Sequence, residues 1–278
     1  MCQVDNHEWT GGKAHLVQVG DVVDRGADSR QCLDLLMALE KQARAAGGAV
    51  HALVGNHEAM NMYGDLRYVS PGDFTAFQDR NSERLRERRY QEHVKELRRA
   101  GKPKPDDAYN QQWMSARPPG WFERLAAFSP AGRYGRWIAR HNTIIRINDA
   151  VFVHGGIGPK YAGAKIRELN DRAREELRDP AKLEGGILMD PEGPFWYRGL
   201  ATGDEAALAS HVDTVLERLG AGRMVVGHTP TGGTVVRRFG GKVILIDTGV
   251  SKAYGSHAAC LLIESGLTKV LYPGPDLP

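Results

Sequence analysis

The sequence has few cysteines and no long apolar segment. Its three cysteines are scattered through 278 residues and form no Cys-x-x-Cys pair. Such a set argues against a disulfide framework and is typical of a reducing compartment. No apolar run approaches the roughly 18 residues that a membrane-spanning helix requires, and the polar first ten residues lack the apolar core of a signal peptide. These absences predict a cytoplasmic protein without a membrane partner.

An excess of charge of one sign is also lacking. The chain has 37 Lys and Arg against 34 Asp and Glu, a formal net charge of +3. The two signs are interleaved, whereas a nucleic-acid binder would more often concentrate Lys and Arg on one face. We therefore expect no nucleic-acid partner. The apolar share of 41% predicts a soluble globular protein.

Apolar runs and turn residues predict alternating strands and helices near the start of the chain. Residues 14–19 and 49–54 have the pattern of buried strands, and residues 29–46 between them have helical spacing before Gly47-Gly48. After Gly222 the pattern becomes rich in strands separated by glycine-containing turns. This order predicts an α/β fold in which two mixed β-sheets pack as a sandwich flanked by helices.

The middle of the chain differs in character. Residues 82–100 are a dense run of charged residues, and prolines at 103, 105, 118 and 119 break the chain beyond it. We interpret residues 64–120 as a cap-like insertion in a single domain that spans residues 1–278. The charged run itself predicts a solvated helix, with a protein-docking face as the alternative.

Residues suited to metal binding are concentrated in loops that follow apolar strands. The loops are 20–26 (GDVVDRG), 55–58 (GNHE), 153–157 (VHGGI) and 226–230 (VGHTP). Asp, Asn and His are hard or borderline ligands that suit manganese, iron or zinc. The neighbouring glycines let the backbone turn sharply and bring such side chains to an ion.

The four loops, in this order, resemble the motifs of the phosphoprotein phosphatases, a family of calcineurin-like metallophosphoesterases. GDxxDRG followed by GNHE is a specific signal, whereas HGG or GHT alone would be weak. Residues 194–199 (PFWYRG), 246–249 (IDTG) and 254–255 (YG) are similar to the bacterial branch known as Shewanella-like phosphatases. The resemblance extends from Lys13 to about Ile263.

The resemblance implies divalent metal ions, with manganese favoured over iron or zinc. Asp21 matches the carboxylate that bridges two metals in the family. Asn56, His154 and His228 match the remaining ligands of the second metal. Two metals about 3.5–4 Å apart can activate a water molecule and hold phosphoryl oxygens together.

The same resemblance implies the groups that act on the substrate. His57 matches the general acid that protonates the leaving alkoxide, and Asp24 matches the carboxylate that orients it. Arg25 and Arg198 match the guanidinium groups that bind phosphate oxygens, for which arginine offers paired hydrogen bonds. Tyr254 matches an aromatic side chain beside the site.

One family motif has no counterpart here. The family begins with a strand ending in Asp-x-His, and those two side chains hold the first metal. Asp5 and His7 have the right letters, but no strand is expected before them and they lie too close to Asp21 for an intervening helix. We interpret them as accidental, within a loop preceding the family's second strand. We therefore expect an exposed sheet edge, one bound metal at most, and weak or absent phosphatase activity.

Structural roles remain as alternatives for most of these residues. Asn56 and His57 could cap a helix, and the histidines of the last two loops could be satisfied core residues. Arg198 could pack on Trp196, and Tyr254 could serve packing alone. Asp21, Asp24 and Arg25 could be a strand-end turn with a surface ion pair, although four such loops in one chain argue against this reading.

The leading hypothesis is a metal-dependent phosphomonoester hydrolase, and more narrowly a protein phosphatase. Its substrate would be a phosphorylated protein or a small phosphomonoester. A phosphodiesterase or dinucleoside polyphosphate hydrolase is one alternative, but no nucleoside pocket is evident in the sequence. A non-catalytic phosphate-binding or scaffold relative is the other.

Overall fold

The computed structural model describes residues 4–273 and begins with a small hairpin. Strand β1 (Val4–Asp5) pairs with β2 (Glu8–Trp9), and the turn between them has positive φ at Asn6 and His7. The backbone N–H of Trp9 donates to Gln42 Oε1 at 2.7 Å. Asp5 and His7 therefore belong to a hairpin against the first helix, and the expectation of a loop here was wrong.

The next two strands form a small parallel sheet. Strand β3 (His15–Gln18) pairs with β4 (Ala49–Ala52), and helix α1 (Ser29–Ala45) connects them. Leu33, Leu36 and Leu39 lie at helical spacing on the buried face of α1. Within residues 4–273, β3 has no other strand neighbour. The predicted strand–helix–strand order is confirmed, with boundaries shifted by one or two residues.

The larger sheet is mixed, in the order β5-β6-β7-β9-β8. Its strands are β5 (Ile144–Ile147), β6 (Ala150–Val153), β7 (Arg223–Val226), β8 (Val236–Arg238) and β9 (Val243–Leu245). Strands β6, β7 and β9 run parallel, and β5 and β8 flank them antiparallel. The last strands, β10 (Cys260–Glu264) and β11 (Leu267–Leu271), form a separate hairpin. The sandwich class is confirmed, although the smaller sheet is purely parallel.

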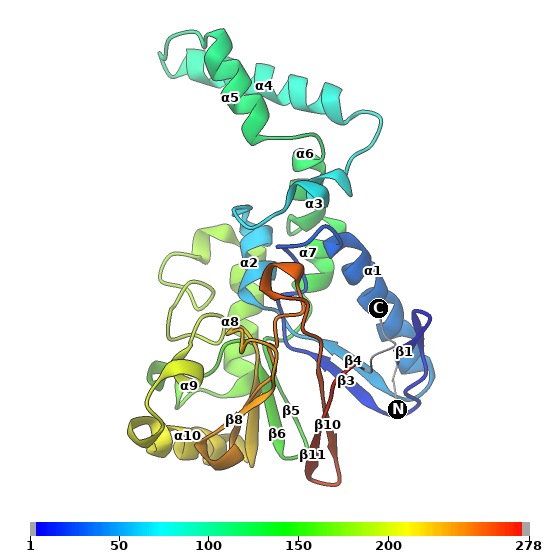
Figure 1. Ribbon diagram of the computed structural model, residues 1–278. Helices are drawn as coiled ribbons and strands as arrows, with labels where there is room; N and C mark the ends of the chain where they lie inside the picture. Colours follow the sequence, from blue (N-terminus) through cyan, green and yellow to red (C-terminus); the bar gives the residue numbers. More distant parts are fainter. Residues whose placement is uncertain (1–3, 274–278) are drawn as a thin grey trace.

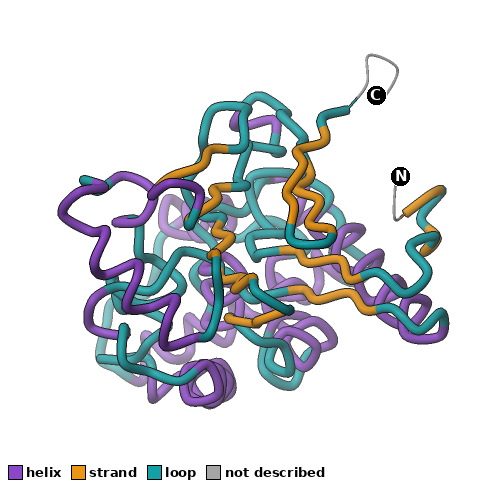
Figure 2. Tube along the Cα trace, turned by 90° about the horizontal axis from the view of Figure 1, so that it is seen from below, coloured by secondary structure: helices purple, strands orange, loops and turns teal. Residues whose placement is uncertain are grey.

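Helices cover the outer faces of the sheets (Figures 1 and 2). Besides α1 they are α2 (Asn56–Tyr63), α3 (Pro71–Thr75), α4 (Ser82–Arg99), α5 (Asp107–Ala116), α6 (Trp121–Phe128), α7 (Arg133–Ile138), α8 (Ile166–Arg178), α9 (Gly199–Thr202) and α10 (Glu205–Leu219). No described helix has both the length and the apolar character to cross a membrane.

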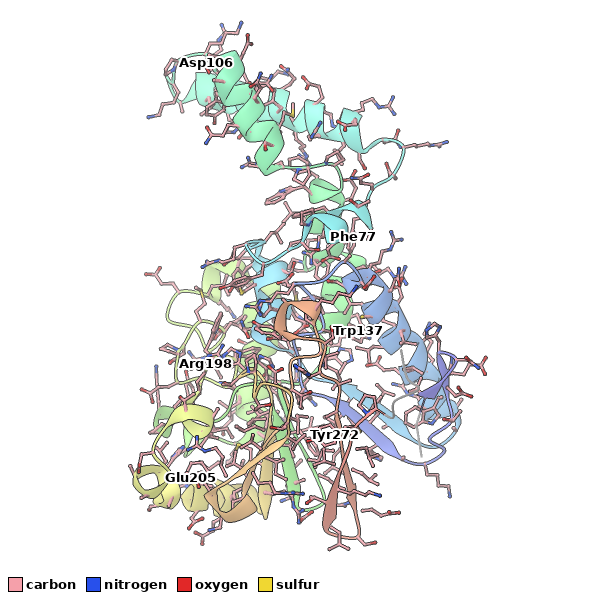
Figure 3. All side chains as sticks on the ribbon, in the orientation of Figure 1. Phe77, Asp106, Trp137, Arg198, Glu205 and Tyr272 are labelled. Carbon is pink, nitrogen blue, oxygen red and sulfur yellow. The ribbon has the colours of Figure 1, made fainter. Side chains whose placement is uncertain are left out.

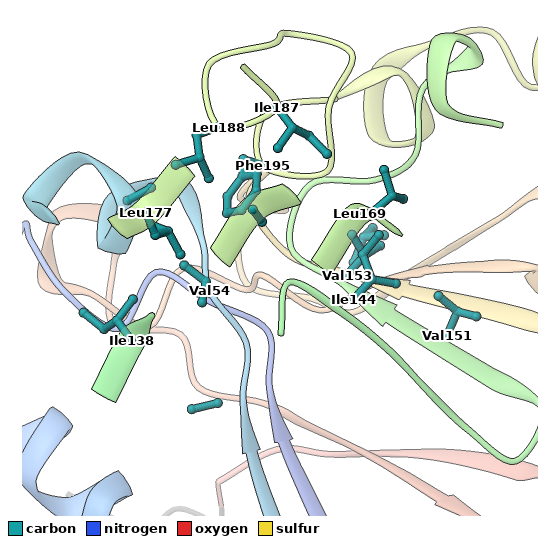
Figure 4. Close-up of a cluster of buried hydrophobic side chains, with 14 of the residues drawn as sticks. Val54, Ile138, Ile144, Val151, Val153, Leu169, Leu177, Ile187, Leu188 and Phe195 are labelled. Carbon is teal, nitrogen blue, oxygen red and sulfur yellow. The ribbon is translucent and has the colours of Figure 1, made fainter. Parts of the chain in front are cut away.

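The main hydrophobic core is one cluster that extends from α1 and β4 to the larger sheet and its helices (Figure 4). Val151 and Val153 of β6 and Leu169 of α8 are almost completely buried there. Each fully buried side chain of this kind contributes roughly 1.5–3 kcal/mol. A second, much smaller cluster of Val19, Leu53 and Ile145 lies where the two sheets face each other. The ends of β3, β4, β6 and β7 are thereby held at one edge of the sandwich.

Helices α4 and α5 project away from the sheets as an arm (Figure 1). Phe77 marks the base of this arm, and Asp106 lies at its far end (Figure 3). The charged helix expected at 82–100 is confirmed as α4, of which only Ser82 and Tyr90 are buried. Helix α6 joins the arm to the body, because it contacts both α4 and α2.

Candidate active site

The first two predicted loops are in direct contact at the strand ends. A Cβ on Gly20 would lie 2.6 Å from the Gly55 nitrogen, and a Cβ on Gly55 would lie 2.4 Å from Asp21 Oδ1. Only glycine allows the two backbones to come this close. The loop glycines of the two motifs therefore serve close packing.

Glu58 joins the same two loops, and the sequence had assigned it no role. Its carboxylate accepts backbone N–H groups of Asp21 at 2.8 Å, Val22 at 2.7 Å and Gly55 at 2.8 Å. Burial raises the pKa of Glu58, and the neighbouring charge of Asp21 raises it further. The bond to Gly55 also caps α2. Gly55 is thus the N-cap, so capping does not explain Asn56 or His57.

The four predicted metal ligands converge on one point. His154 Nε2 lies 3.0 Å from Asn56 Oδ1, 3.1 Å from His228 Nδ1 and 3.2 Å from Asp21 Oδ2. The ligand atoms of the carboxylate and the two imidazoles all lie within 4.8 Å of one another. Asp5 and His7 do not belong to this group, which agrees with their interpretation as accidental.

The charges of this group fit a cation. The Nδ1–H of His154 donates to the Val19 carbonyl at 2.7 Å, which turns Nε2 towards the cluster. Burial disfavours the charged imidazole, but attraction from Asp21 outweighs it and raises the pKa of His154. Burial raises the pKa of Asp21 while His154 lowers it, and the net shift is downwards. The carboxylate is thus ionised, and it favours positive charge at this point.

His228 supports the same reading. Burial and the positive charges of His154 and Arg198 lower the pKa of His228 to about 3, so the ring is neutral and able to act as a ligand. The ring nitrogen that faces the cluster is Nδ1, 3.1 Å from His154 Nε2, and the second ring nitrogen, Nε2, is buried without a hydrogen-bond partner among the described residues. Oxygen and imidazole ligands about 3 Å apart have the spacing expected around an ion with metal–ligand distances of about 2.0–2.2 Å. The residues present therefore fit a divalent metal ion.

His57 and Asp24 form a buried pair beside this cluster. His57 Nδ1 donates to Asp24 Oδ2 at 2.7 Å, and the His57 backbone N–H donates to Asp21 Oδ1 at 3.0 Å. The exposed fractions of the two residues are 3% and 8%. His57 Nε2 lies 3.9 Å from Asp21 Oδ2, so this ring nitrogen faces the group of predicted metal ligands.

Two further side chains hold Asp24, and sequence reasoning missed both. Asn61, one turn after His57 in α2, donates to Asp24 Oδ1 at 3.0 Å and to the His57 carbonyl at 2.9 Å. Arg124 of α6 lies 3.2 Å from Asp24 Oδ1 and is completely buried. Neither residue belongs to a motif that marks it in the sequence.

The predicted phosphate-binding residues lie on the more open side of the site. Arg25 NH1 donates to His57 Nε2 at 3.1 Å, and its guanidinium lies over the rings of Tyr68 at 4.6 Å and Tyr254 at 5.1 Å. Tyr254 therefore packs on Arg25. Tyr68, in the loop between α2 and α3, packs on the same guanidinium, and sequence reasoning gave it no role.

Arg198 lies near the upper end of the larger sheet in Figure 3. Its NH1 donates to the His228 carbonyl at 2.9 Å and to Thr229 Oγ1 at 3.0 Å. These bonds, and not stacking on Trp196, are the contacts that position it. The site also affects Asp247. Burial raises the pKa of its carboxyl group and the charge of Asp21 raises it further, whereas the hydrogen bond from the Gly249 N–H lowers it.

The backbone at the site is strained. Asp21, Asp24, Arg25 and His228 have φ values of 60°, 74°, 55° and 64°. Side chains other than glycine rarely adopt this left-handed region, and such residues are commonly found at functional sites. The left-handed backbone conformation turns these side chains towards the site at the end of the sheets.

A comparison with known proteins agrees with this geometry. A family model described as calcineurin-like phosphoesterase matches residues 8–232. An uncharacterized protein of Schizosaccharomyces pombe is 34% identical over 94% of this chain and 69% of its own length. Shewanella-like protein phosphatase 2 of Arabidopsis thaliana is 32% identical over 88% of this chain and 64% of its own. Because these relatives are eukaryotic, the resemblance is not confined to bacteria.

A solved structure is similar over most of the fold. The cold-active protein tyrosine phosphatase of a psychrophilic Shewanella species has a TM-score of 0.69 and 28% identity, covering 96% of this chain and 72% of that one. The four motif loops, their convergence on one cluster and the family match over residues 8–232 lead to the same conclusion: this chain belongs to the calcineurin-like phosphoesterase family.

Proposed function

We propose that the chain is a metal-dependent phosphomonoester hydrolase, and more narrowly a protein phosphatase. The observation that carries the proposal is the placement of the His57–Asp24 pair directly beside the Asp21–His154–His228 group. A phosphate-binding scaffold needs no buried proton donor next to a metal site. The names of the relatives, which include protein phosphatases, support the same class.

Asp21, Asn56, His154 and His228 would hold the metal ion. A divalent cation bound there would neutralise phosphate charge and lower the pKa of a bound water molecule. Manganese is our first candidate, with iron and zinc as alternatives that the same ligands accept. Within the described residues only one such group is present, so we propose one tightly held metal per chain.

The protein's own residues bind phosphate and move the proton. Arg25 contacts His57 beside the cluster, and Arg198 contacts His228 within it. Each guanidinium could therefore turn towards a phosphoryl oxygen of a bound substrate. Arg25 donates to His57 Nε2 in this structure. When phosphate takes up Arg25, Nε2 becomes free to carry the proton that the leaving-group oxygen requires, while Asp24 holds Nδ1.

The test is hydrolysis of p-nitrophenyl phosphate and of phosphopeptides by the purified chain, supplied in turn with Mn²⁺, Fe²⁺ or Zn²⁺. Because the described residues hold only one metal group, we expect weak metal-dependent turnover. His57→Asn should abolish hydrolysis of the phosphopeptides, whose alkoxide leaving group needs a proton, and should leave most of the turnover of p-nitrophenyl phosphate. We expect no turnover of diadenosine tetraphosphate. Preferential turnover of the dinucleotide would favour the polyphosphate hydrolase alternative. Binding of inorganic phosphate without turnover of any ester would favour the non-catalytic alternative.

Metal content is measured separately by elemental analysis. We expect a ratio near one ion per chain, falling in a variant with Asp21→Asn. A ratio near two would contradict the one-metal proposal without affecting the proposal of hydrolysis.

A further inference from the structure

Arg124 is a completely buried arginine in a short helix outside the sequence motifs. Arginine is rarely buried unless its charge is paired and its donors are satisfied. Here Nε and NH2 donate to Asp73 Oδ2 at 3.2 and 2.8 Å, NH2 also donates to Asp24 Oδ1 at 3.2 Å, and NH1 donates to Asn61 Oδ1. One guanidinium thus binds both carboxylates and the amide that surround the back of the His57–Asp24 pair.

The second carboxylate, Asp73, is bound through one of its two oxygens, Oδ2, to which Arg124 and Ser29 donate. It is completely buried, and Ser29 donates to its Oδ2 at 2.8 Å. Its Oδ1 has no partner among the described residues. Ser29 Oγ also accepts the backbone N–H of Asp24 at 3.1 Å. Arg124, Asp73 and Ser29 therefore form a closed set of contacts around the side chain and the backbone of Asp24.

This set connects the catalytic pair to the base of the arm. Asp73 lies in α3 and Arg124 in α6, whereas Asn61 lies in α2 with His57. The start of α6 packs directly on α3, because a Cβ on Gly120 would lie 2.0 Å from the Phe74 carbonyl oxygen. The arm is thus joined to α2 by charged groups as well as by apolar packing.

We propose that Arg124 and Asp73 are positioning residues for the proposed phosphatase reaction, which fix Asp24 so that the His57 ring presents Nε2 to the leaving group. Asp24 has only one oxygen for His57, because Arg124 binds the other. Without the guanidinium, two buried carboxylates would lose their common partner, and the Asp24 side chain could turn away from His57. Both residues are completely buried, so their effect on the reaction would pass through Asp24 and His57.

The kinetic test compares two aryl phosphates of similar size in Arg124→Met. Phenyl phosphate has a poor leaving group that needs a proton, whereas the p-nitrophenolate of p-nitrophenyl phosphate leaves without one. We expect kcat for phenyl phosphate to fall about 100-fold, at the lower end of what general acid catalysis typically contributes. We expect kcat for p-nitrophenyl phosphate to fall by no more than about threefold, with both KM values unchanged. Equal losses with the two substrates would overturn the proposal.

A second set of variants guards against simple misfolding. The double variant Asp73→Asn with Arg124→Met also removes the buried negative charge of Asp73 that Arg124→Met leaves unpaired. It should therefore fold, and it should show the same fall in kcat for phenyl phosphate without a comparable fall for p-nitrophenyl phosphate. Arg238→Met is the matched control, because Arg238 is also largely buried and donates to the carbonyls of Leu200 and Gly203. We expect that control to leave the ratio of the two kcat values unchanged.

A spectroscopic measurement separates this proposal from the proposed function. In the full chain labelled with ¹⁵N-histidine, the Nδ1 proton of His57 should give a low-field resonance, assigned through its loss in His57→Gln. We expect Arg124→Met to remove or shift this signal and Arg238→Met to preserve it. An unchanged signal overturns the positioning role. A chain that hydrolyses no phosphate ester would contradict the proposed function, while this signal still decides the role of Arg124.

Discussion

The two sides of the candidate site are built in opposite ways. On the proton-donor side, His57, Asp24 and Arg124 have exposed fractions of 3%, 8% and 0%, and each is bound by several neighbours. On the phosphate side, Tyr254 is 38% exposed, and Arg198 is an exposed residue held by His228 and Thr229. The side chains of the buried side are held in place by the protein itself. On the open side, the guanidinium of Arg198 is exposed and can donate hydrogen bonds to a substrate.

Physical chemistry explains the difference. A buried charge is costly unless its partners are in place, so a buried network must be complete in order to form at all. Exposed arginines keep their hydration and need fewer partners. We therefore expect changes on the buried side to affect both folding and turnover. Changes on the open side should affect mainly the binding of phosphate.

The largest expected effect comes from Asp21→Asn, at the junction of the two sides. The variant keeps the size of the side chain but removes the charge that the metal group requires. We expect metal binding to fall sharply and kcat/KM to fall by more than the roughly 10²–10³-fold that loss of a single oxyanion donor costs. Calorimetric titration with Mn²⁺ and steady-state kinetics measure the two effects. Retained metal affinity would show that Asn56, His154 and His228 suffice.

Gly55→Ala tests how tightly the buried side is packed. The new Cβ would lie 2.4 Å from Asp21 Oδ1, and overpacking of this kind costs about 1–3 kcal/mol. We expect a lower free energy of unfolding in urea and reduced activity. Gly163→Ala is the control, since its Cβ would meet only Arg218 at 3.9 Å. Equal stability of the two variants would show that the loop contact can relax.

Arg198→Ala tests the open side. Loss of a charged hydrogen-bond donor to phosphate is worth about 1.5–3 kcal/mol, which corresponds to a rise in KM of roughly 10- to 100-fold. Because Arg198 is exposed, we expect the free energy of unfolding to change by no more than about 0.5 kcal/mol. Inhibition constants for inorganic phosphate, measured in parallel, should rise with KM. A large loss of stability would remove the contrast between the two sides.

Tyr254→Leu should have the smallest effect. Its ring lies 5.1 Å from the Arg25 guanidinium, and a cation–π contact at an exposed position is worth about 0.5–1 kcal/mol. We expect KM to rise about two- to fivefold with kcat and stability unchanged. The matched variant Tyr68→Leu removes the second ring over Arg25 and should also alter kcat, because Tyr68 lies 5.0 Å from the His57 ring.

Much of the fold could be predicted because its elements have strong local signals. Strands β3 and β4 are short apolar runs bounded by glycine or polar residues, and their predicted positions are confirmed. Strands β6 and β7 lie directly before the third and fourth motif loops, where apolar strands were expected. Helix α2 was not predicted, although Asn56 and His57 were considered as possible caps; the cap is Gly55, with Glu58 at the third helical position. The short helices α3, α5 and α6 were also missed, although the apolar residues of α6 lie at helical spacing.

The amino-acid sequence by itself determined the motif loops, the strands that precede them and therefore the edge of the sheets at which the site forms. Only the tertiary structure decided what surrounds that site. Asp73 and Arg124 lie 49 and 100 positions after Asp24. Nothing in the sequence around Arg124, which has both polar and apolar neighbours in a short helix, predicts that its side chain is buried. Its role arises because α6 packs on α2 and brings the guanidinium to Asp24, and long-range packing of this kind leaves no local pattern in the chain.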